Sequence, residues 1–121
     1  MKLLLVDDDP NMRRLITLMF KSTKIQLEAA ASARTALRKL KDNTYDIIIS
    51  DLQMPEIDGI AFLKELKAAG HSIPVIIMSA YGLQKLADMA LEAGAVMVLE
   101  KPIQKEKLLK AVNKIISKGH A

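Results

Sequence analysis

Short apolar runs alternate along the chain with longer segments in which apolar residues recur every three or four positions. The runs cover residues 3–6, 26–30, 47–49, 75–78 and 96–99, and the second is the weakest. Continuous rather than alternating hydrophobicity indicates strands that are buried on both faces. The stripes between the runs indicate amphipathic helices. The pattern therefore predicts a strand followed by a helix, five times over.

Residues typical of helix ends support these boundaries. Pro10 suits a first helical turn, Ser32 and Asp58 are good N-caps, and Gly70 and Gly94 fall where the third and fourth helices should stop. Parallel strands joined by right-handed crossover helices form a three-layer, doubly wound α/β fold. We predict this (βα)5 fold for residues 1–121 as a single domain.

The amino-acid composition excludes several classes of protein and of functional site. The 121 residues include no Cys, which excludes disulfide scaffolds, cysteine-ligated metals and thiol nucleophiles. No apolar run approaches the ~20 residues that cross a bilayer. We expect a soluble, cytoplasmic protein with no membrane partner.

The net charge of +4 is unevenly spread. From residue 101 onward there are six Lys and one Glu, which leaves 12 basic and 13 acidic residues before that point. We interpret the run Lys105, Lys107, Lys110, Lys114 and Lys118 as the solvated face of the last helix. Only four aromatic residues are available to stack on bases, and no helix is left for a helix-turn-helix motif. We therefore expect no specific binding of nucleic acid.

Polar residues follow four of the five predicted strands. They are Asp7-Asp8-Asp9, Ser50-Asp51, Ser79-Ala80-Tyr81-Gly82 and Glu100-Lys101-Pro102. Ligands of open parallel sheets bind beyond the carboxyl ends of the strands. Three carboxylates, one hydroxyl and one ammonium should therefore meet at one rim.

Carboxylates packed together repel one another unless a cation joins them. Hard oxygen ligands at this density suit Mg²⁺, or Mn²⁺ in its place. A cation and a lysine beside a carboxylate are typical of phosphoryl transfer. Asp51 is the natural acceptor because it stands singly at a strand end, while Asp7 and Asp8 can hold the metal. We assign Asp9 to the start of the first helix, where it meets the helix dipole favourably.

Four segments together resemble the receiver domain of bacterial two-component response regulators. They are Leu4-Leu5-Val6-Asp7-Asp8-Asp9, Ile49-Ser50-Asp51-Leu52-Gln53-Met54-Pro55-Glu56-Ile57-Asp58-Gly59, Met78-Ser79-Ala80 and Lys101-Pro102, in the family's order over essentially the whole chain. The resemblance implies the flavodoxin-like strand order 2-1-3-4-5. It also implies that Asp51 accepts a phosphoryl group from the phosphohistidine of a sensor histidine kinase or a histidine phosphotransferase.

The resemblance implies the remaining site roles. Asp7, Asp8, Asp51 and the backbone carbonyl of Gln53 match the ligands of Mg²⁺. Ser79 and Lys101 match the hydroxyl and ammonium that bind the phosphoryl oxygens, and the Lys101-Pro102 peptide matches one that is often cis. Gln53 and Tyr81 match two positions that tune how long the phosphoaspartate survives.

One position departs from the family pattern. The family often has Phe or Tyr three residues before the Lys-Pro pair, where this chain has Val98. A small aliphatic side chain cannot change its position with the switch as an aromatic ring does in the family. The resemblance implies kinase docking on the first helix, with Met12, Arg13 and Leu15 as candidates, and signalling through the fourth and fifth helices to a downstream effector or fused output domain.

Two alternatives stay open. Val98 is compatible with a docking module that works independently of phosphorylation. Asp7 and Asp9 also fit the nucleophile and acid/base of haloacid-dehalogenase-like phosphatases, but that family needs a later acidic pair after a strand, and none follows Ser79 or Val98. We expect a phosphoacceptor signalling domain that catalyses only its own phosphorylation and dephosphorylation, not an enzyme with a separate substrate.

Overall fold

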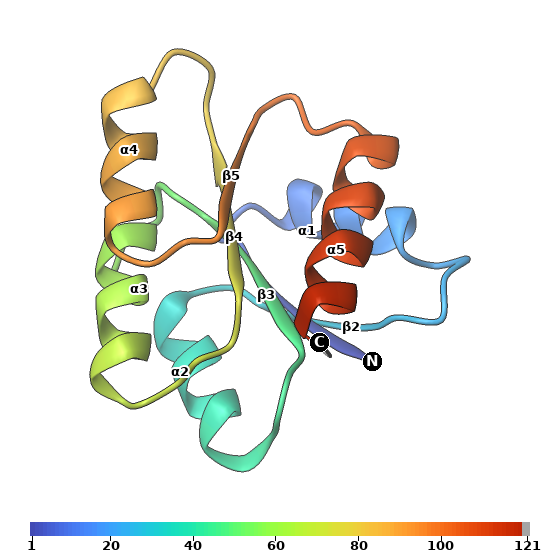
Figure 1. Ribbon diagram of the computed structural model, residues 1–121, viewed down its shortest axis with the longest axis horizontal. Helices are drawn as coiled ribbons and strands as arrows, with labels where there is room; N and C mark the ends of the chain where they lie inside the picture. The colour runs from blue at the N-terminus through green and yellow to red at the C-terminus, as the bar shows by residue number, and fades with distance from the viewer. Residues whose placement is uncertain (120–121) are drawn as a thin grey trace.

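A computed structural model describes residues 1–119 and shows one parallel sheet with helices on both faces (Figure 1). The strands are β1 (Lys2–Val6), β2 (Gln26–Ala30), β3 (Ile47–Asp51), β4 (Val75–Ser79) and β5 (Met97–Glu100), and the helices are α1 (Pro10–Met19), α2 (Ala33–Asp42), α3 (Gly59–Ala68), α4 (Gln84–Glu92) and α5 (Lys105–Gly119). The strand order is β2-β1-β3-β4-β5, and every pair is parallel. The predicted three-layer fold and strand order are confirmed.

Each central strand contributes side chains to two hydrophobic clusters, one on each face of the sheet. Successive side chains of a strand point to opposite faces, so Leu4 and Ile48 lie in one cluster while Leu5 and Ile49 lie in the other. The first cluster packs under α2, α3 and α4, and the second packs under α1 and α5 (Figure 1). Burial on both faces explains the continuously apolar runs. None of the helices within residues 1–119 is long and apolar enough to cross a membrane.

The helix ends follow the expected chemistry. The side chains of Asp9, Ser32 and Asp58 each accept a hydrogen bond from a backbone N–H in the first turn of α1, α2 and α3. Gly70 and Gly94 follow α3 and α4 with φ of 83° and 118°, a left-handed conformation that favours glycine. The predicted capping residues are confirmed.

Three strands end later than their apolar runs. β3, β4 and β5 include Asp51, Ser79 and Glu100, because parallel pairing continues through these residues, as in Ser79 beside Glu100. Val96, which we predicted to begin the fifth strand, precedes β5 and is 49% exposed. Backbone pairing, rather than hydrophobicity, thus carries the polar residues to the rim.

The lysines of α5 face solvent as predicted. The exposed ones are Lys105, Lys107, Lys110 and Lys114, whereas the side chain of Lys118 lies outside the described part of the chain.

Candidate functional site

The acidic residues meet where β1 and β3 run side by side. Val6 pairs with Ser50, so the next residues, Asp7 and Asp51, emerge together at the carboxyl edge of the sheet. Asp7, Asp8 and Asp51 each offer a carboxylate oxygen, and these oxygens lie within 4.8 Å of one another. The expected convergence of three carboxylates is therefore present; we call this trio the acidic group.

Asp7 is fully buried at this edge. Its Oδ1 accepts a hydrogen bond from the Asp9 N–H at 2.9 Å, whereas its Oδ2 is buried and has no hydrogen-bond partner among the residues that the structure describes. Burial raises the pKa of Asp7, and the charges of Asp51 and Asp8 act in the same direction; the Asp9 hydrogen bond and the charge of Lys101 oppose them. An unpartnered, buried carboxylate oxygen beside two further carboxylates fits a divalent cation.

Lys101 supplies the positive charge of the rim. Its Nζ lies 3.1 Å from Asp51 Oδ1, and the two side chains are 28% and 10% exposed. The backbone N–H of Lys101 donates to the Ser79 carbonyl at 2.7 Å, which ties the end of β5 to the end of β4. The Lys101-Pro102 peptide is cis, as the resemblance implied. Asp51 therefore has an ammonium as well as two carboxylates beside it.

Ser79 lies at the same edge but is turned to its own loop. Its side chain is buried, and its hydroxyl donates to the Ala80 carbonyl at 3.2 Å. The hydroxyl must leave this carbonyl before it can donate to a group carried by Asp51.

Gly59 supports Asp51 in a way that the sequence analysis missed. Its N–H donates to the Leu52 carbonyl at 2.7 Å. A Cβ at this position would lie 2.7 Å from the Asp51 carbonyl oxygen and 2.8 Å from the Leu52 Cα. The start of α3 thus approaches the Asp51 backbone more closely than any side chain permits. The available signal was a glycine directly after the N-cap Asp58, where a helix does not otherwise need one.

The residues 3–113 match the family model of the response regulator receiver domain. The chain belongs to this family. Among its relatives, the transcriptional regulatory protein ZraR of Escherichia coli (strain K12) is 34% identical over 119 residues, which are 98% of this chain and 27% of ZraR. The receiver domain thus spans about a quarter of the length of this relative.

Solved structures agree with the family membership. The receiver domain of the Francisella response regulator 1452 has a TM-score of 0.90 and 32% identity, with 97% of each chain covered. Full-length FixJ from B. japonicum has a TM-score of 0.91 and 30% identity, covering 98% of this chain and 58% of FixJ. Mg²⁺ is typical of receiver domains, and the acidic group is one that can hold a divalent cation.

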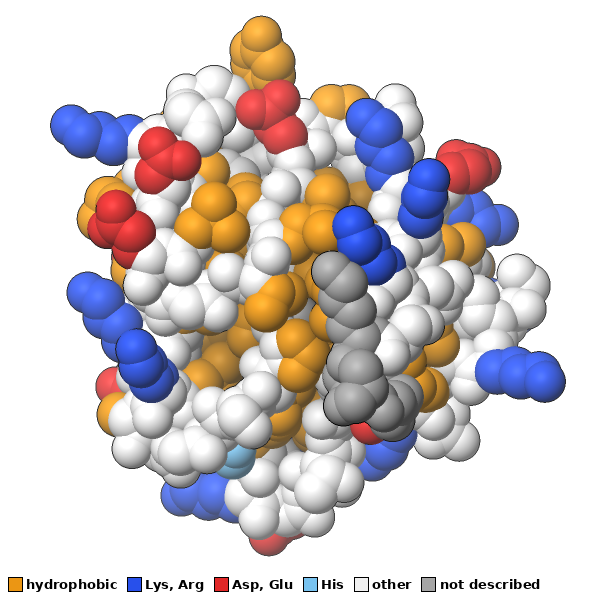
Figure 2. Space-filling model, in the orientation of Figure 1, with side chains coloured by type: hydrophobic (Ala, Val, Ile, Leu, Met, Phe, Trp, Pro, Cys, Tyr) orange, Lys and Arg blue, Asp and Glu red, His pale blue; other side chains and the backbone are white. Residues whose placement is uncertain are grey.

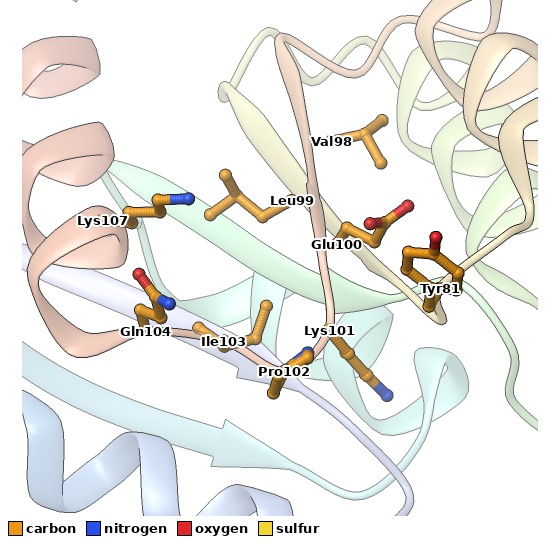
Figure 3. Close-up of a pocket in the computed structure, with 9 residues that line it drawn as sticks. All are labelled: Tyr81, Val98, Leu99, Glu100, Lys101, Pro102, Ile103, Gln104 and Lys107. Atoms are coloured by element: carbon orange, nitrogen blue, oxygen red, sulfur yellow. The ribbon is translucent and has the colours of Figure 1, made fainter.

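Three further residues for which we predicted a role lie in β5 or in the loops after β3 and β4. Gln53 is exposed in the loop after β3, and Tyr81 is 82% exposed in the loop after β4. Val98 is half-buried and lines a cavity of about 300 Å³ together with Tyr81, Glu100 and Lys101 (Figure 3). In this view Val98 and Glu100 point to the Tyr81 side of β5, and Leu99 points toward α5.

A second cavity, of about 170 Å³, lies beside Ser79. It is lined by Val98 with Leu83, Ala87 and Leu91, among others. The small side chain of Val98 thus leaves open space between β5 and α4, next to the residue proposed to bind the phosphoryl group.

The candidate docking residues on α1 differ in exposure. Met12 packs against the core, and Arg13 is half-buried, with its Nη1 donating to the Asp7 carbonyl at 2.7 Å. Leu15 is 47% exposed, although its spacing had also placed it on the apolar stripe of the helix. Leu18, three residues on, is 57% exposed and was missed. Arg14 is exposed on the same helix.

Proposed function

We propose that this receiver domain is a phosphorylation switch whose phosphoacceptor is Asp51. The observation that supports this role is the position of the Asp51 carboxylate, with Lys101 at 3.1 Å and the carboxylates of Asp7 and Asp8 within 4.8 Å. In the reaction an Asp51 oxygen attacks phosphorus, the P–N bond of a phosphohistidine breaks, and the imidazole leaves with the bonding electron pair. Catalysis then consists of positioning and of neutralising charge on the phosphoryl oxygens.

Asp7, Asp8 and Asp51, with the backbone carbonyl of Gln53, would hold Mg²⁺, or Mn²⁺ in its place. A cation held there would neutralise the charge of the acidic group and of the phosphoryl oxygens. Asp7 Oδ2, which has no other partner within residues 1–119, is free to be a ligand. Asp9 is the N-cap of α1, and we assign it no part in the chemistry.

Phosphorylation stores a signal as new charge at the rim. The phosphoryl group adds strong acceptors that attract Lys101 and the Ser79 hydroxyl. Turning Ser79 breaks its hydrogen bond to Ala80, which frees the loop between β4 and α4. Gln53 and Tyr81, both exposed in the loops after β3 and β4, would control how water reaches the phosphoaspartate.

The face made by α4, β5 and α5 is the proposed output surface. Figure 2 shows hydrophobic side chains in the middle of this face, with acidic side chains toward α4 and basic ones toward α5. Exposed residues of these elements include Asp88, Glu92 and Glu100 on one side and Lys107 and Lys110 on the other. A downstream effector or a fused output domain would meet this face. We propose no specific nucleic-acid contact for the receiver domain itself.

The phosphodonor partner would dock on α1. Leu15 and Leu18 form an exposed apolar pair on this helix. The helix begins at the rim, so a partner bound along it brings its phosphohistidine to Asp51. Sensor histidine kinases and histidine phosphotransferases are the expected partners.

Val98 supports a second candidate, a docking module whose partner binding does not depend on phosphorylation. Because the space beside Val98 is open, no large side chain of β5 lies next to Ser79 to be displaced when the Ser79 hydroxyl turns. Equal affinity of an effector for the phosphorylated and unphosphorylated protein would favour this candidate, and a difference would favour the switch.

The proposed chemistry is tested by incubating the protein with a small acyl phosphate and Mg²⁺ and measuring its intact mass. We expect one phosphoryl adduct on the wild type, none after chelation of Mg²⁺ and none on Asp51→Asn. An adduct that persists in Asp51→Asn and vanishes in Asp7→Asn would instead identify Asp7 as the nucleophile.

A further inference from the structure

Arg13 connects α1 to the acidic group. Its half-buried guanidinium donates from Nη1 to the main-chain carbonyl of Asp7 at 2.7 Å. Because the donor is charged, this hydrogen bond is stronger than one between neutral groups. The docking residue predicted from the sequence is therefore directed to the site rather than to solvent.

The contact acts on the peptide that joins two carboxylate residues. The carbonyl of Asp7 lies in the same rigid plane as the nitrogen and Cα of Asp8. Asp7 is held in addition by the hydrogen bonds of its own N–H to Ala30 and of its Oδ1 to the Asp9 N–H. Asp8 is exposed, and none of the side-chain hydrogen bonds found within residues 1–119 involves its carboxylate. The peptide plane that Arg13 contacts fixes the position of the Asp8 Cα, and with it the point from which the Asp8 carboxylate extends.

We propose that Arg13 is a positioning residue for the divalent-cation site, which orients the Asp7-Asp8 peptide so that both carboxylates face the same point. The inference rests on the proposed function, since it takes the acidic group to be the metal site. Arg13 touches neither the metal nor the phosphoryl group in this role; it acts through the backbone of Asp7.

Positioning and electrostatics predict opposite effects of removing this side chain. Loss of a positive charge near the acidic group favours binding of a cation. Loss of the hydrogen bond releases the Asp7-Asp8 peptide and weakens binding. Weaker Mg²⁺ binding in Arg13→Gln therefore reports positioning, because the change in charge alone acts in the other direction. Arg14→Gln is the matched control, with the same change in charge on the neighbouring, exposed residue.

The test is calorimetric titration of Mg²⁺ into the full chain at a temperature well below its Tm. Arg13→Gln should bind Mg²⁺ about tenfold more weakly than the wild type, as expected for loss of a residue that orients metal ligands. Arg14→Gln should bind as tightly as the wild type or more tightly. Arg13→Lys, which keeps the charge and one donor, should recover part of the affinity. A merely structural role would lower Tm without changing Mg²⁺ affinity.

Equal Mg²⁺ affinity of Arg13→Gln and Arg14→Gln overturns the positioning role. If Arg13→Gln does not fold, Arg13→Lys decides, with the wild type and Arg14→Lys as references of the same charge: weaker binding than both supports the role, and equal binding overturns it. The wild type separates this inference from the proposed function. If the wild type takes up Mg²⁺ and phosphate and only the Arg13 effect is missing, the proposed function stands. If the wild type does not bind Mg²⁺, both are wrong.

Discussion

Asp7→Asn isolates the electrostatics of the acidic group, and we expect it to stabilise the protein in the absence of divalent cations. The Asp7 side chain is fully buried, and its Oδ2 accepts no hydrogen bond from the described part of the chain. Asparagine keeps the shape of the side chain and removes its charge. Its amide can also donate to a neighbouring carboxylate, which the Asp7 carboxylate cannot do.

The magnitude follows from the spacing of the carboxylates. The ligand oxygens of Asp7 and Asp51 lie within 4.8 Å, where two unit charges repel by about 3.5 kcal/mol at an effective dielectric constant of about 20. Lys101, 3.1 Å from Asp51, offsets part of this repulsion. We expect Asp7→Asn to raise the free energy of unfolding by about 1–2 kcal/mol. For a domain of this size, Tm rises by roughly 4–8 °C.

The pH dependence of stability gives the sign of the effect of Asp7→Asn independently of any change in packing. Burial raises the pKa of Asp7 in the folded protein above its ordinary value of 3.8. Between the unfolded and folded pKa values the folded state binds more protons, so the stability that Asp7 contributes is complete below the unfolded pKa and is lost as pH rises through the folded pKa. The advantage of Asp7→Asn should therefore grow with pH across this window and shrink below about pH 4.

The assay is urea unfolding in a chelator over a series of pH values. Asp88→Asn is the control, because Asp88 is exposed on α4 and the amide oxygen of asparagine can still accept the hydrogen bond that Gln84 Nε2 donates to Asp88; we expect the same loss of charge to change the free energy of unfolding by less than about 0.5 kcal/mol. Added Mg²⁺ should stabilise the wild type by mass action and Asp7→Asn much less. A neutral or destabilising Asp7→Asn at neutral pH, or an advantage that does not vary with pH, would refute the reasoning.

Three further substitutions test other contacts of the site. Lys101→Met removes the ammonium beside Asp51 and should lower the free energy of unfolding in urea by about 1–3 kcal/mol; unchanged stability would contradict the ion pair. Gly59→Ala places a Cβ 2.7 Å from the Asp51 carbonyl oxygen, so thermal unfolding should show that the free energy of unfolding falls by about 1–3 kcal/mol. Intact-mass measurements should show that this variant is phosphorylated more slowly than the wild type. A wild-type Tm would argue against the close approach. Asp9→Ser keeps the helix cap and should retain both stability, within about 0.5 kcal/mol, and phosphorylation; loss of phosphorylation alone would show that Asp9 has a chemical role.

The convergence of Asp7, Asp8 and Asp51 was predictable because parallel strands end at the same edge of a sheet. The positions of Val96 and Leu15 were not. Val96 belongs to an apolar run and its N–H donates to the Val75 carbonyl of β4, but the parallel register with β4 begins only at Met97, and Val96 is exposed. Leu15 shares the apolar spacing of α1, but spacing identifies a face of a helix without showing which residues its neighbours cover.

The supporting residues of the site depend on distances that periodicity does not contain. Arg13 reaches back six residues to the Asp7 carbonyl, and Gly59 meets the Asp51 backbone at the start of α3. Both contacts join elements whose relative placement is set by packing in the sheet. Sequence motifs therefore identified the charged groups, and the structure was needed to find what holds them in place.

Locating the phosphoryl group on the chain tests the role of Asp51 most directly. The protein is phosphorylated with a small acyl phosphate and Mg²⁺. The aspartyl phosphate formed on the chain is trapped by reduction, and the modified residue is identified by peptide mass spectrometry. We predict a single modified residue, Asp51, and no modification after Asp51→Asn. Modification of Asp7 or Asp8 instead, or no adduct on the wild type, would contradict the proposed function.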